Sequence, residues 1–259
     1  MNTNWNGTMG RIFLGAGTLA GTCLMAVAAD AQTPATPVDP AANPTGWKSS
    51  AALGATITRG NSETVTVNGT VLSEKKWNKN ELSLGAGFTY GEDEDKVNAS
   101  TVNGFVQYNR LMSERFYIYG RVDALHDDVA HLTYRVTLSP GAGYYFIKND
   151  KITLSGEAGP GIAFEKFWSE DEKSYWTLRF GQKFTWKITD HSRFWEMLDY
   201  SPKVDDWADY ALAAEVGIET DITKHLALRL VAQDNYRSKP ATGRKENDFR
   251  LMAGVAYKF

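Results

Sequence analysis

The stretch FRLMAGVAYKF, residues 249–259, ends the chain with an uninterrupted alternation of two kinds of side chain. Side chains of a β-strand point to opposite faces with a period of two. One face of this segment therefore carries Phe249, Leu251, Ala253, Val255, Tyr257 and Phe259. The other face carries Arg250, Met252, Gly254, Ala256 and Lys258. The pattern predicts a C-terminal strand with one apolar and one polar face.

An aromatic C-terminus behind such an apolar face resembles the signal that the barrel assembly machinery of the Gram-negative outer membrane recognises. In this chain the signal consists of Phe259, Tyr257 and Val255. It predicts an outer-membrane location, a barrel fold, and the assembly machinery as a partner during biogenesis. It does not indicate what the barrel does.

Residues 1–31 are typical of a signal peptide. Arg11 precedes an apolar stretch over residues 12–27, and the small residues of Ala28-Ala29-Asp30-Ala31 follow. Cleavage after Ala28 and cleavage after Ala31 both fit this pattern. Residues 32–45 hold four of the eight prolines and little apolar bulk, which predicts a Pro/Ala-rich periplasmic lead. Residues 46–259 then form a single barrel domain.

The composition excludes several function classes. The single cysteine, Cys23, lies in the predicted signal peptide, so the processed chain has no disulfide, thiolate metal site or cysteine nucleophile. A net charge of −3 and a pI of about 5.9 argue against a nucleic-acid partner. The mean hydropathy of −0.38 is compatible with a membrane barrel, because only alternate residues of its strands meet lipid. We expect no cofactor and no resident metal.

Alternation of the same kind recurs along the whole predicted domain and marks twelve segments, an even number as in bacterial single-chain barrels. The segments are Trp47–Thr58, Glu63–Ser73, Glu81–Tyr90, Asn98–Asn109, Phe116–Leu125, His131–Ile147, Lys151–Glu165, Ser174–Thr189, Arg193–Pro202, Asp209–Thr220, His225–Arg237 and Asp248–Phe259. The weakest is Arg193–Pro202, where Glu196 interrupts the apolar face. The pattern predicts an all-β fold, an antiparallel barrel of twelve strands.

A soluble lipocalin-like barrel would show the same period with its apolar face inward. Three features favour lipid instead. Several segments exceed the length of ordinary strands, bulky aromatic residues gather near the segment ends, and the polar face is rich in glycine and charge. In the segment 131–147 this assignment places Leu132, Tyr134, Val136, Leu138, Ala142, Tyr144 and Phe146 outward. With an even strand count, both termini and the shorter connections belong on the periplasmic side.

Several short motifs resemble one family. They are Arg59-Gly60-Asn61-Ser62-Glu63-Thr64, Leu132-Thr133-Tyr134-Arg135, Gly141-Ala142-Gly143-Tyr144-Tyr145, Gly159-Pro160-Gly161, and Pro240 before the last strand. Their order is similar to that of the salt-induced outer-membrane proteins, a domain-of-unknown-function family of Gram-negative barrels. The resemblance implies an outer-membrane barrel with no established activity, and it links expression to salt or osmotic stress.

The polar face assigns many charged side chains to the barrel interior. One reading is a narrow passive channel for small solutes, whose excess of cations gives a weak anion preference. The alternative is an ion-pair-filled structural barrel without transport, since buried charges need partners. The candidate lumen residues are Arg121, Asp123, Arg135, Glu157, Arg179, Lys183, Lys187, Glu215, Glu219, Arg229 and Arg250, to which Glu165 and Lys258 are added on the same face.

The sequence also raises two further chemistries, divalent-cation binding and lipid hydrolysis. Acidic runs such as Glu92-Asp93-Glu94-Asp95 and Glu170-Asp171-Glu172 can bridge divalent cations to lipopolysaccharide, but none matches a Ca²⁺ loop, and solvated loops explain them better. We expect outer-membrane lipid and lipopolysaccharide as surroundings. A lipid hydrolase needs a serine within reach of a histidine. Ser139 lies too deep along its strand to meet His131, so we expect no enzyme.

Overall fold

The structure is a computed structural model that describes residues 46–58, 64–93, 96–240 and 246–259. The predicted signal peptide, the Pro/Ala-rich lead and residues 59–63 of the first family motif lie outside the described residues. Within them, no helix is long and apolar enough to cross a membrane.

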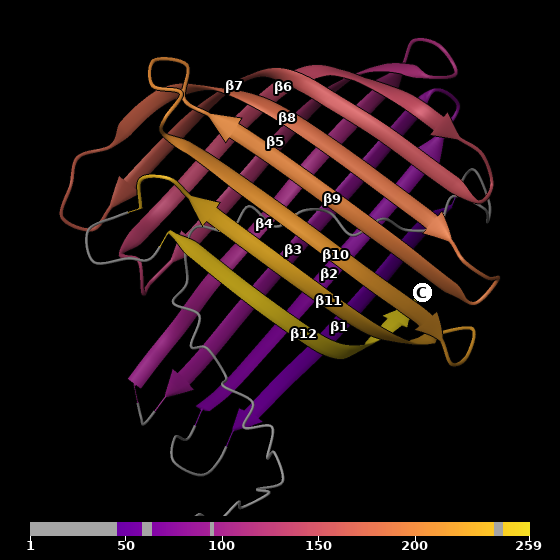
Figure 1. Cartoon of the computed structure of the whole chain (residues 1–259), viewed down its shortest axis with the longest axis horizontal. Coiled ribbons are helices and arrows are strands. Elements are labelled where there is room, and N and C mark those ends of the chain that lie inside the picture. The colour runs from indigo at the N-terminus through magenta and orange to yellow at the C-terminus, as the bar shows by residue number, and fades with distance from the viewer. Residues whose placement is uncertain (1–45, 59–63, 94–95, 241–245) are drawn as a thin grey trace, which may run out of the picture.

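Twelve antiparallel strands close into one barrel, with β1 paired to β12 (Figure 1). This confirms the predicted fold class. The strands are β1 Trp47–Thr58, β2 Thr64–Trp77, β3 Asn80–Asp93, β4 Lys96–Leu111, β5 Phe116–Asp127, β6 Leu132–Lys148, β7 Ile152–Phe167, β8 Lys173–Lys187, β9 Ser192–Pro202, β10 Tyr210–Asp221, β11 Leu226–Arg237 and β12 Asn247–Lys258. The weak segment around Glu196 is present as β9.

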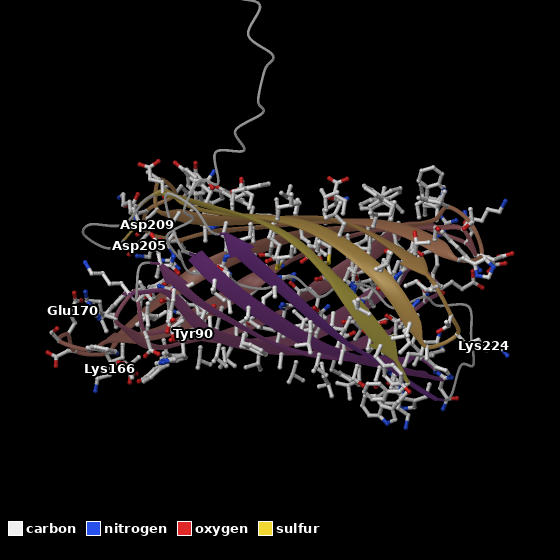
Figure 2. The ribbon with its side chains drawn as sticks, turned by 90° about the horizontal axis from the view of Figure 1, so that it is seen from below. Tyr90, Lys166, Glu170, Asp205, Asp209 and Lys224 are labelled. Atoms are coloured by element: carbon white, nitrogen blue, oxygen red, sulfur yellow. The ribbon has the colours of Figure 1, made fainter. Side chains whose placement is uncertain are left out.

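The chain enters and leaves the barrel at the same end. Ser50 pairs with Lys258, and the backbones of Ser49 and Phe259 exchange two hydrogen bonds of 3.0 and 3.2 Å. We call this the turn end, because it carries the connections of two to four residues at 78–79, 112–115, 149–151, 188–191 and 222–225. The opposite end, which carries the connections that follow the odd-numbered strands, is the loop end. Figure 2 shows Lys224 at the turn end and Glu170, Asp205 and Tyr90 at the loop end.

Local sequence explains the turns. Ser113, Asn149 and Thr223 each use a side-chain oxygen to accept the backbone N–H three residues later, at 2.8–3.0 Å. Such contacts let short polar side chains stabilise a tight reversal of the chain. In the connection 78–79, Asn78 has φ of 49°, a left-handed conformation that Asn tolerates better than most residues.

The outer surface is apolar between two zones rich in aromatic residues. Phe180 and Val216, near the middle of their strands, are 42% and 43% exposed. Towards the loop end the rings of Tyr200, Tyr210 and Tyr236 follow one another on β9, β10 and β11, with centroids 5.3 and 5.7 Å apart. Other large apolar side chains on this surface include Leu53, Val71, Phe88, Val106, Val122, Leu138, Trp186, Ile218, Leu230, Leu251 and Tyr257.

One predicted outward residue is misplaced. Leu132 is fully buried rather than outward, because the β6–β7 register shifts between Leu132 and Tyr134. The preceding residue, His131, has φ of 56°, so the chain enters β6 through a left-handed step. The irregularity moves Leu132 off the apolar face, and a second register shift between Tyr145 and Ile147 leaves Phe146 and Ile147 both exposed.

The interior contains aromatic rings that lie over glycines of the next strand. A Cβ added at Gly143 would stand 2.2 Å from the ring of Tyr117, and one at Gly217 would stand 2.0 Å from Trp195. Phe105 covers Gly85 in the same way. The glycines of the polar face therefore do not simply widen the lumen. They make room for large side chains, which fill much of the barrel.

Candidate functional site: the polar lumen

Most of the predicted lumen residues are buried inside the barrel. Lys183, Lys187 and Arg250 are half-buried, and the side chain of Glu157 is 13% exposed. Those less than 9% exposed are Arg121, Asp123, Arg135, Glu165, Arg179, Glu215, Glu219 and Arg229. Lys258, at the turn end, has a side chain that is 30% exposed.

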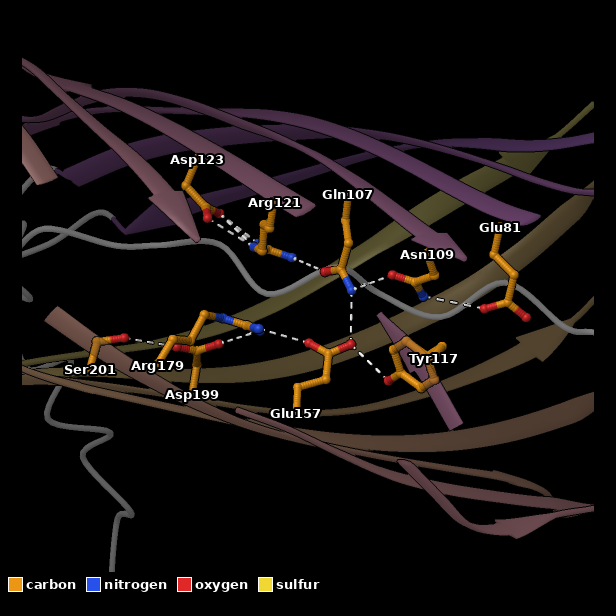
Figure 3. A network of polar contacts seen from close by, with 10 residues as sticks. All are labelled: Glu81, Gln107, Asn109, Tyr117, Arg121, Asp123, Glu157, Arg179, Asp199 and Ser201. Atoms are coloured by element: carbon orange, nitrogen blue, oxygen red, sulfur yellow. Dashed lines mark hydrogen bonds and ion pairs between the residues drawn. The ribbon is translucent and has the colours of Figure 1, made fainter. Parts of the chain in front are cut away.

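Glu157 of β7 is the centre of the largest set of polar contacts (Figure 3). Its carboxylate accepts hydrogen bonds from Gln107 of β4 at 2.8 Å, from the Tyr117 hydroxyl of β5 at 2.8 Å, and from Arg179 of β8 at 2.7 Å. Because β4 and β8 are not neighbours in the sheet, these contacts cross the lumen.

The contacts continue on both sides of Glu157. The Arg179 guanidinium also binds Asp199 of β9 at 2.6 Å. On the other side, Arg121 donates to Gln107 Oε1 at 3.0 Å and holds both oxygens of Asp123 at 2.6–3.0 Å. We call the six residues Asp123, Arg121, Gln107, Glu157, Arg179 and Asp199 the lumen network.

A second cluster links β9 to β12 near the turn end. Glu219 is 1% exposed, and its carboxylate lies 2.6 Å from Arg229, 3.1 Å from Arg193 and 2.9 Å from Lys258. Four residues before Glu219 on β10, and further from the turn end, Glu215 accepts hydrogen bonds from the Trp195 indole and from Gln233, both at 2.6 Å. Each buried carboxylate here has several donors, the arrangement that makes a buried charge tolerable.

A third group lies inside the barrel towards the loop end. Arg135 binds Glu165 at 2.5 Å, and Tyr175 donates to the same carboxylate at 3.1 Å. The cavity beside this group measures only about 30 Å³.

A cavity of about 310 Å³ opens at the turn end. The lumen network forms its inner wall through Gln107, Glu157 and Asp199. Among its cations, Lys76 pairs with Glu81 at 3.3 Å, and Lys148 stands 4.3 Å above the Tyr145 ring. Lys183 lines the cavity and has no ion pair or hydrogen bond within the described part of the chain. Lys183 is thus available to a solute anion in this cavity.

Several residues of the site were missing from the prediction. Asp199 and Arg193 lie on β9, whose alternation is the weakest of the twelve segments, so the pattern does not mark their side as the inner face. Glu81 is the first residue of the predicted segment and the second of β3, and Gln107 carries no charge. Tyr117, Tyr145 and Trp195 are inward aromatic residues that hydrogen-bond carboxylates, against the rule that aromatic side chains face outward.

The histidines considered for catalysis have structural contacts. His126 approaches the Thr133 carbonyl at 2.8 Å and Asp128 at 2.9 Å through its two ring nitrogens. The ring of His131 lies 4.7 Å from that of Trp168, and Ser139 is buried on the inner face of β6. None of the hydrogen bonds found in the described residues joins Ser139 to either histidine.

The carboxylates of the acidic loops form hydrogen bonds and ion pairs with neighbouring protein groups. Asp128 accepts from Ser100, a hydrogen bond that lowers the pKa of Asp128. Glu170 pairs with Lys173, and Asp206 of the connection 203–209 pairs with Lys239 after β11. Over the described ranges, no group of three or more His, Cys, Asp or Glu side chains is arranged to hold a metal ion.

Residues 51–259 match the family described as "Protein of unknown function, DUF481". The chain belongs to this family. The match confirms the resemblance to a domain-of-unknown-function family. A relative in Escherichia coli K12, the uncharacterized protein YdiY, is 21% identical over 170 residues, which are 65% of this chain and 65% of that protein. The DUF481 chain studied here therefore matches somewhat less than two thirds of YdiY.

Solved structures similar to this DUF481 chain are outer-membrane barrels. The NanC porin superposes with a TM-score of 0.52 at 11% identity, covering 82% of this chain and all of that porin. An outer membrane channel from Pseudomonas putida F1 gives a TM-score of 0.50 at 12% identity, covering 86% of this chain and all of that channel. At such identities the likeness concerns the fold alone.

Proposed function

We propose that this DUF481 protein is a narrow passive channel of the Gram-negative outer membrane, with its turn end in the periplasm. The observation that carries the proposal is the turn-end cavity of about 310 Å³, which reaches inward to the lumen network. Charged side chains at a constriction select solutes by charge and size. The outward apolar surface, the aromatic zones and the resemblance to porin folds support the membrane location.

The selectivity we propose is a weak preference for anions. Six lysines and arginines line the turn-end cavity, against five carboxylates. In the lumen network Arg121 pairs with Asp123, and Arg179 is shared by Glu157 and Asp199, whereas Lys183 is available to a solute. Acidic loops at the other mouth oppose anions, but salt screens their field over about 8 Å at physiological ionic strength. A link to salt stress remains a proposal from family resemblance.

Single-channel recording in planar bilayers tests the channel. The purified protein should give small conductance steps, and reversal potentials across a salt gradient should indicate anions. The double variant Arg179→Ala/Asp199→Ala removes one wall of the lumen network and keeps its net charge, although Glu157 loses its guanidinium partner. Its steps should be several-fold larger. The matched control Glu170→Ala/Lys173→Ala removes an exposed loop pair and should conduct like the parent.

A specific observation favours one other candidate, the ion-pair-filled structural barrel. Aromatic rings over glycines, and buried pairs such as Arg135–Glu165, occupy much of the interior. The same recordings separate the two candidates. A correctly folded barrel that conducts neither as the parent nor as the double variant would contradict the channel and support the structural role. A cation preference would contradict only the proposed selectivity.

A further inference from the structure

Glu196 is a carboxylate on the outer surface of the barrel, which is otherwise mostly apolar. It is exposed on the outer surface of β9, where it pairs in register with Phe184 of β8 and Val216 of β10. On its own strand the aromatic residues Phe194 and Tyr200 lie on either side of it. Glu196 therefore stands inside the apolar zone and not at its rim.

A polar neighbour accompanies this carboxylate. Gln182 of β8 pairs in register with Leu198, so it is the diagonal neighbour of Glu196 on the same outward face. Diagonal residues of adjacent strands lie about 7–8 Å apart, within reach of long side chains. Yet across the described part of the chain the side chains of Glu196 and Gln182 make no hydrogen bond or ion pair. By contrast, the outward Asp234 has Asn247 at 3.5 Å.

Lipid hydrocarbon cannot form hydrogen bonds with the Glu196 carboxylate or the Gln182 amide. Ionisable residues within a membrane are costly and are normally matched by a protein group. Lipid tails offer no donor or acceptor, and headgroups lie beyond the aromatic zones. What Glu196 needs is a hydrogen-bond donor at its own depth, and what Gln182 needs is an acceptor there.

We infer that a second copy of this chain covers the outer face of β8, β9 and β10, so that the protein is a two-fold dimer. In a two-fold interface residue i contacts residue j of the other copy, and j contacts i. The Gln182 amide of each copy then donates to the Glu196 carboxylate of the other. Phe180, Leu198 and Val216 surround the polar pairs with exposed apolar area. The inference rests on the membrane location proposed above, but not on conduction.

Cysteine crosslinking in native outer membranes tests the dimer. In a Cys23→Ser background of the full chain, Leu198→Cys lies next to both polar residues and should give a disulfide-linked band of twice the subunit mass under mild oxidation. Val122→Cys, on β5 at the other side of the barrel, is the matched control, since Val122 and Leu198 are both 40% exposed. It should crosslink at least ten-fold less.

A second set of variants isolates the hydrogen bonds. Adding Glu196→Leu/Gln182→Leu to Leu198→Cys should abolish the crosslink while the barrel stays folded and heat-modifiable, because leucine suits lipid. Adding Glu196→Gln should keep it, since two carboxamides can still pair. Equal crosslinking at both cysteines, a crosslink that survives the leucine pair, or a linked band of another mass would overturn the inference. Absence of the chain from the outer-membrane fraction would instead overturn the proposed location, and with it the setting that the dimer requires.

Discussion

The substitution Glu219→Gln tests whether the lumen charges hold the barrel together. Glu219 is 1% exposed, with Arg229 at 2.6 Å, Arg193 at 3.1 Å and Lys258 at 2.9 Å. Two unit charges about 4 Å apart attract by about 4 kcal/mol at an effective dielectric constant of about 20. Desolvation offsets much of this attraction, and removing one partner of a buried pair costs about 3–5 kcal/mol in measured cases.

We expect the same loss here, of about 3–5 kcal/mol in the free energy of unfolding, because glutamine keeps the shape and leaves three cations facing one another. With a urea slope of about 2 kcal/mol/M, the unfolding midpoint should fall by about 2 M. The assay is urea unfolding of the refolded barrel in detergent micelles, followed by tryptophan fluorescence. The control Glu170→Gln breaks an exposed loop pair and should not move the midpoint. Equal midpoints for Glu219→Gln and the parent would refute the reasoning.

Three further predictions concern the wall, the C-terminus and the loops. Phe180→Arg, at a 42% exposed outward position, should destabilise the barrel by about 2–4 kcal/mol, whereas Lys183→Gln inside should change unfolding little; the opposite ranking would mean that the apolar surface does not face lipid. Phe259→Asp should lower the yield of heat-modifiable barrel in the outer membrane and leave periplasmic aggregate, and an undiminished yield would contradict the proposed assembly signal. The hydrogen bond from Lys239 lowers the pKa of Asp206, so this link between two loops contributes at neutral pH and is lost as pH falls below the ordinary value of 3.8. The protection factors of the amides at 203–209, which compare their exchange rates with the intrinsic rates at the same pH, should therefore stay constant down to about pH 4 and fall below it. Lys239→Ala should lower these protection factors at neutral pH. Protection factors that change neither with pH nor with Lys239→Ala would show that the pair does not hold the loops.

The fold could be predicted from the alternation of apolar and polar residues, because each strand of a barrel has an apolar outer face and a polar inner face in its own sequence. The twelve segments needed no knowledge of their neighbours. The errors occurred where a residue's position depends on another strand. Leu132 is buried because β6 and β7 shift register beside it, and nothing within residues 131–147 encodes that shift. The predicted second segment ends at Ser73, four residues before β2 does, because Glu74, Lys75 and Lys76 place charges on both faces of the strand.

The candidate site was less predictable, for the same physical reason. Alternation places Arg121 and Glu157 inside, but it does not say whether a donor on β8 meets an acceptor on β7 or on β9. The inward positions of Tyr117 and Trp195 were not predicted, since both look like wall residues until their hydroxyl and indole groups are seen to hydrogen-bond carboxylates. Glycines such as Gly143 on the next strand were the available signal, because a large ring inside the barrel needs a position without a side chain.

The lumen network joins parts of the wall that the sheet itself does not connect. Backbone hydrogen bonds run only between neighbouring strands. Gln107 of β4 and Arg179 of β8 are instead linked through Glu157 of β7, which accepts a hydrogen bond from each. The side chains that narrow the passage are therefore the same ones that brace the barrel across its interior. Any variant that widens the lumen by removing Arg179 should lose stability as well, and conductance and resistance to urea should vary in opposite directions along a series of network variants. A purely structural barrel would lose stability in that series without gaining conductance, which makes the joint measurement more decisive than either one.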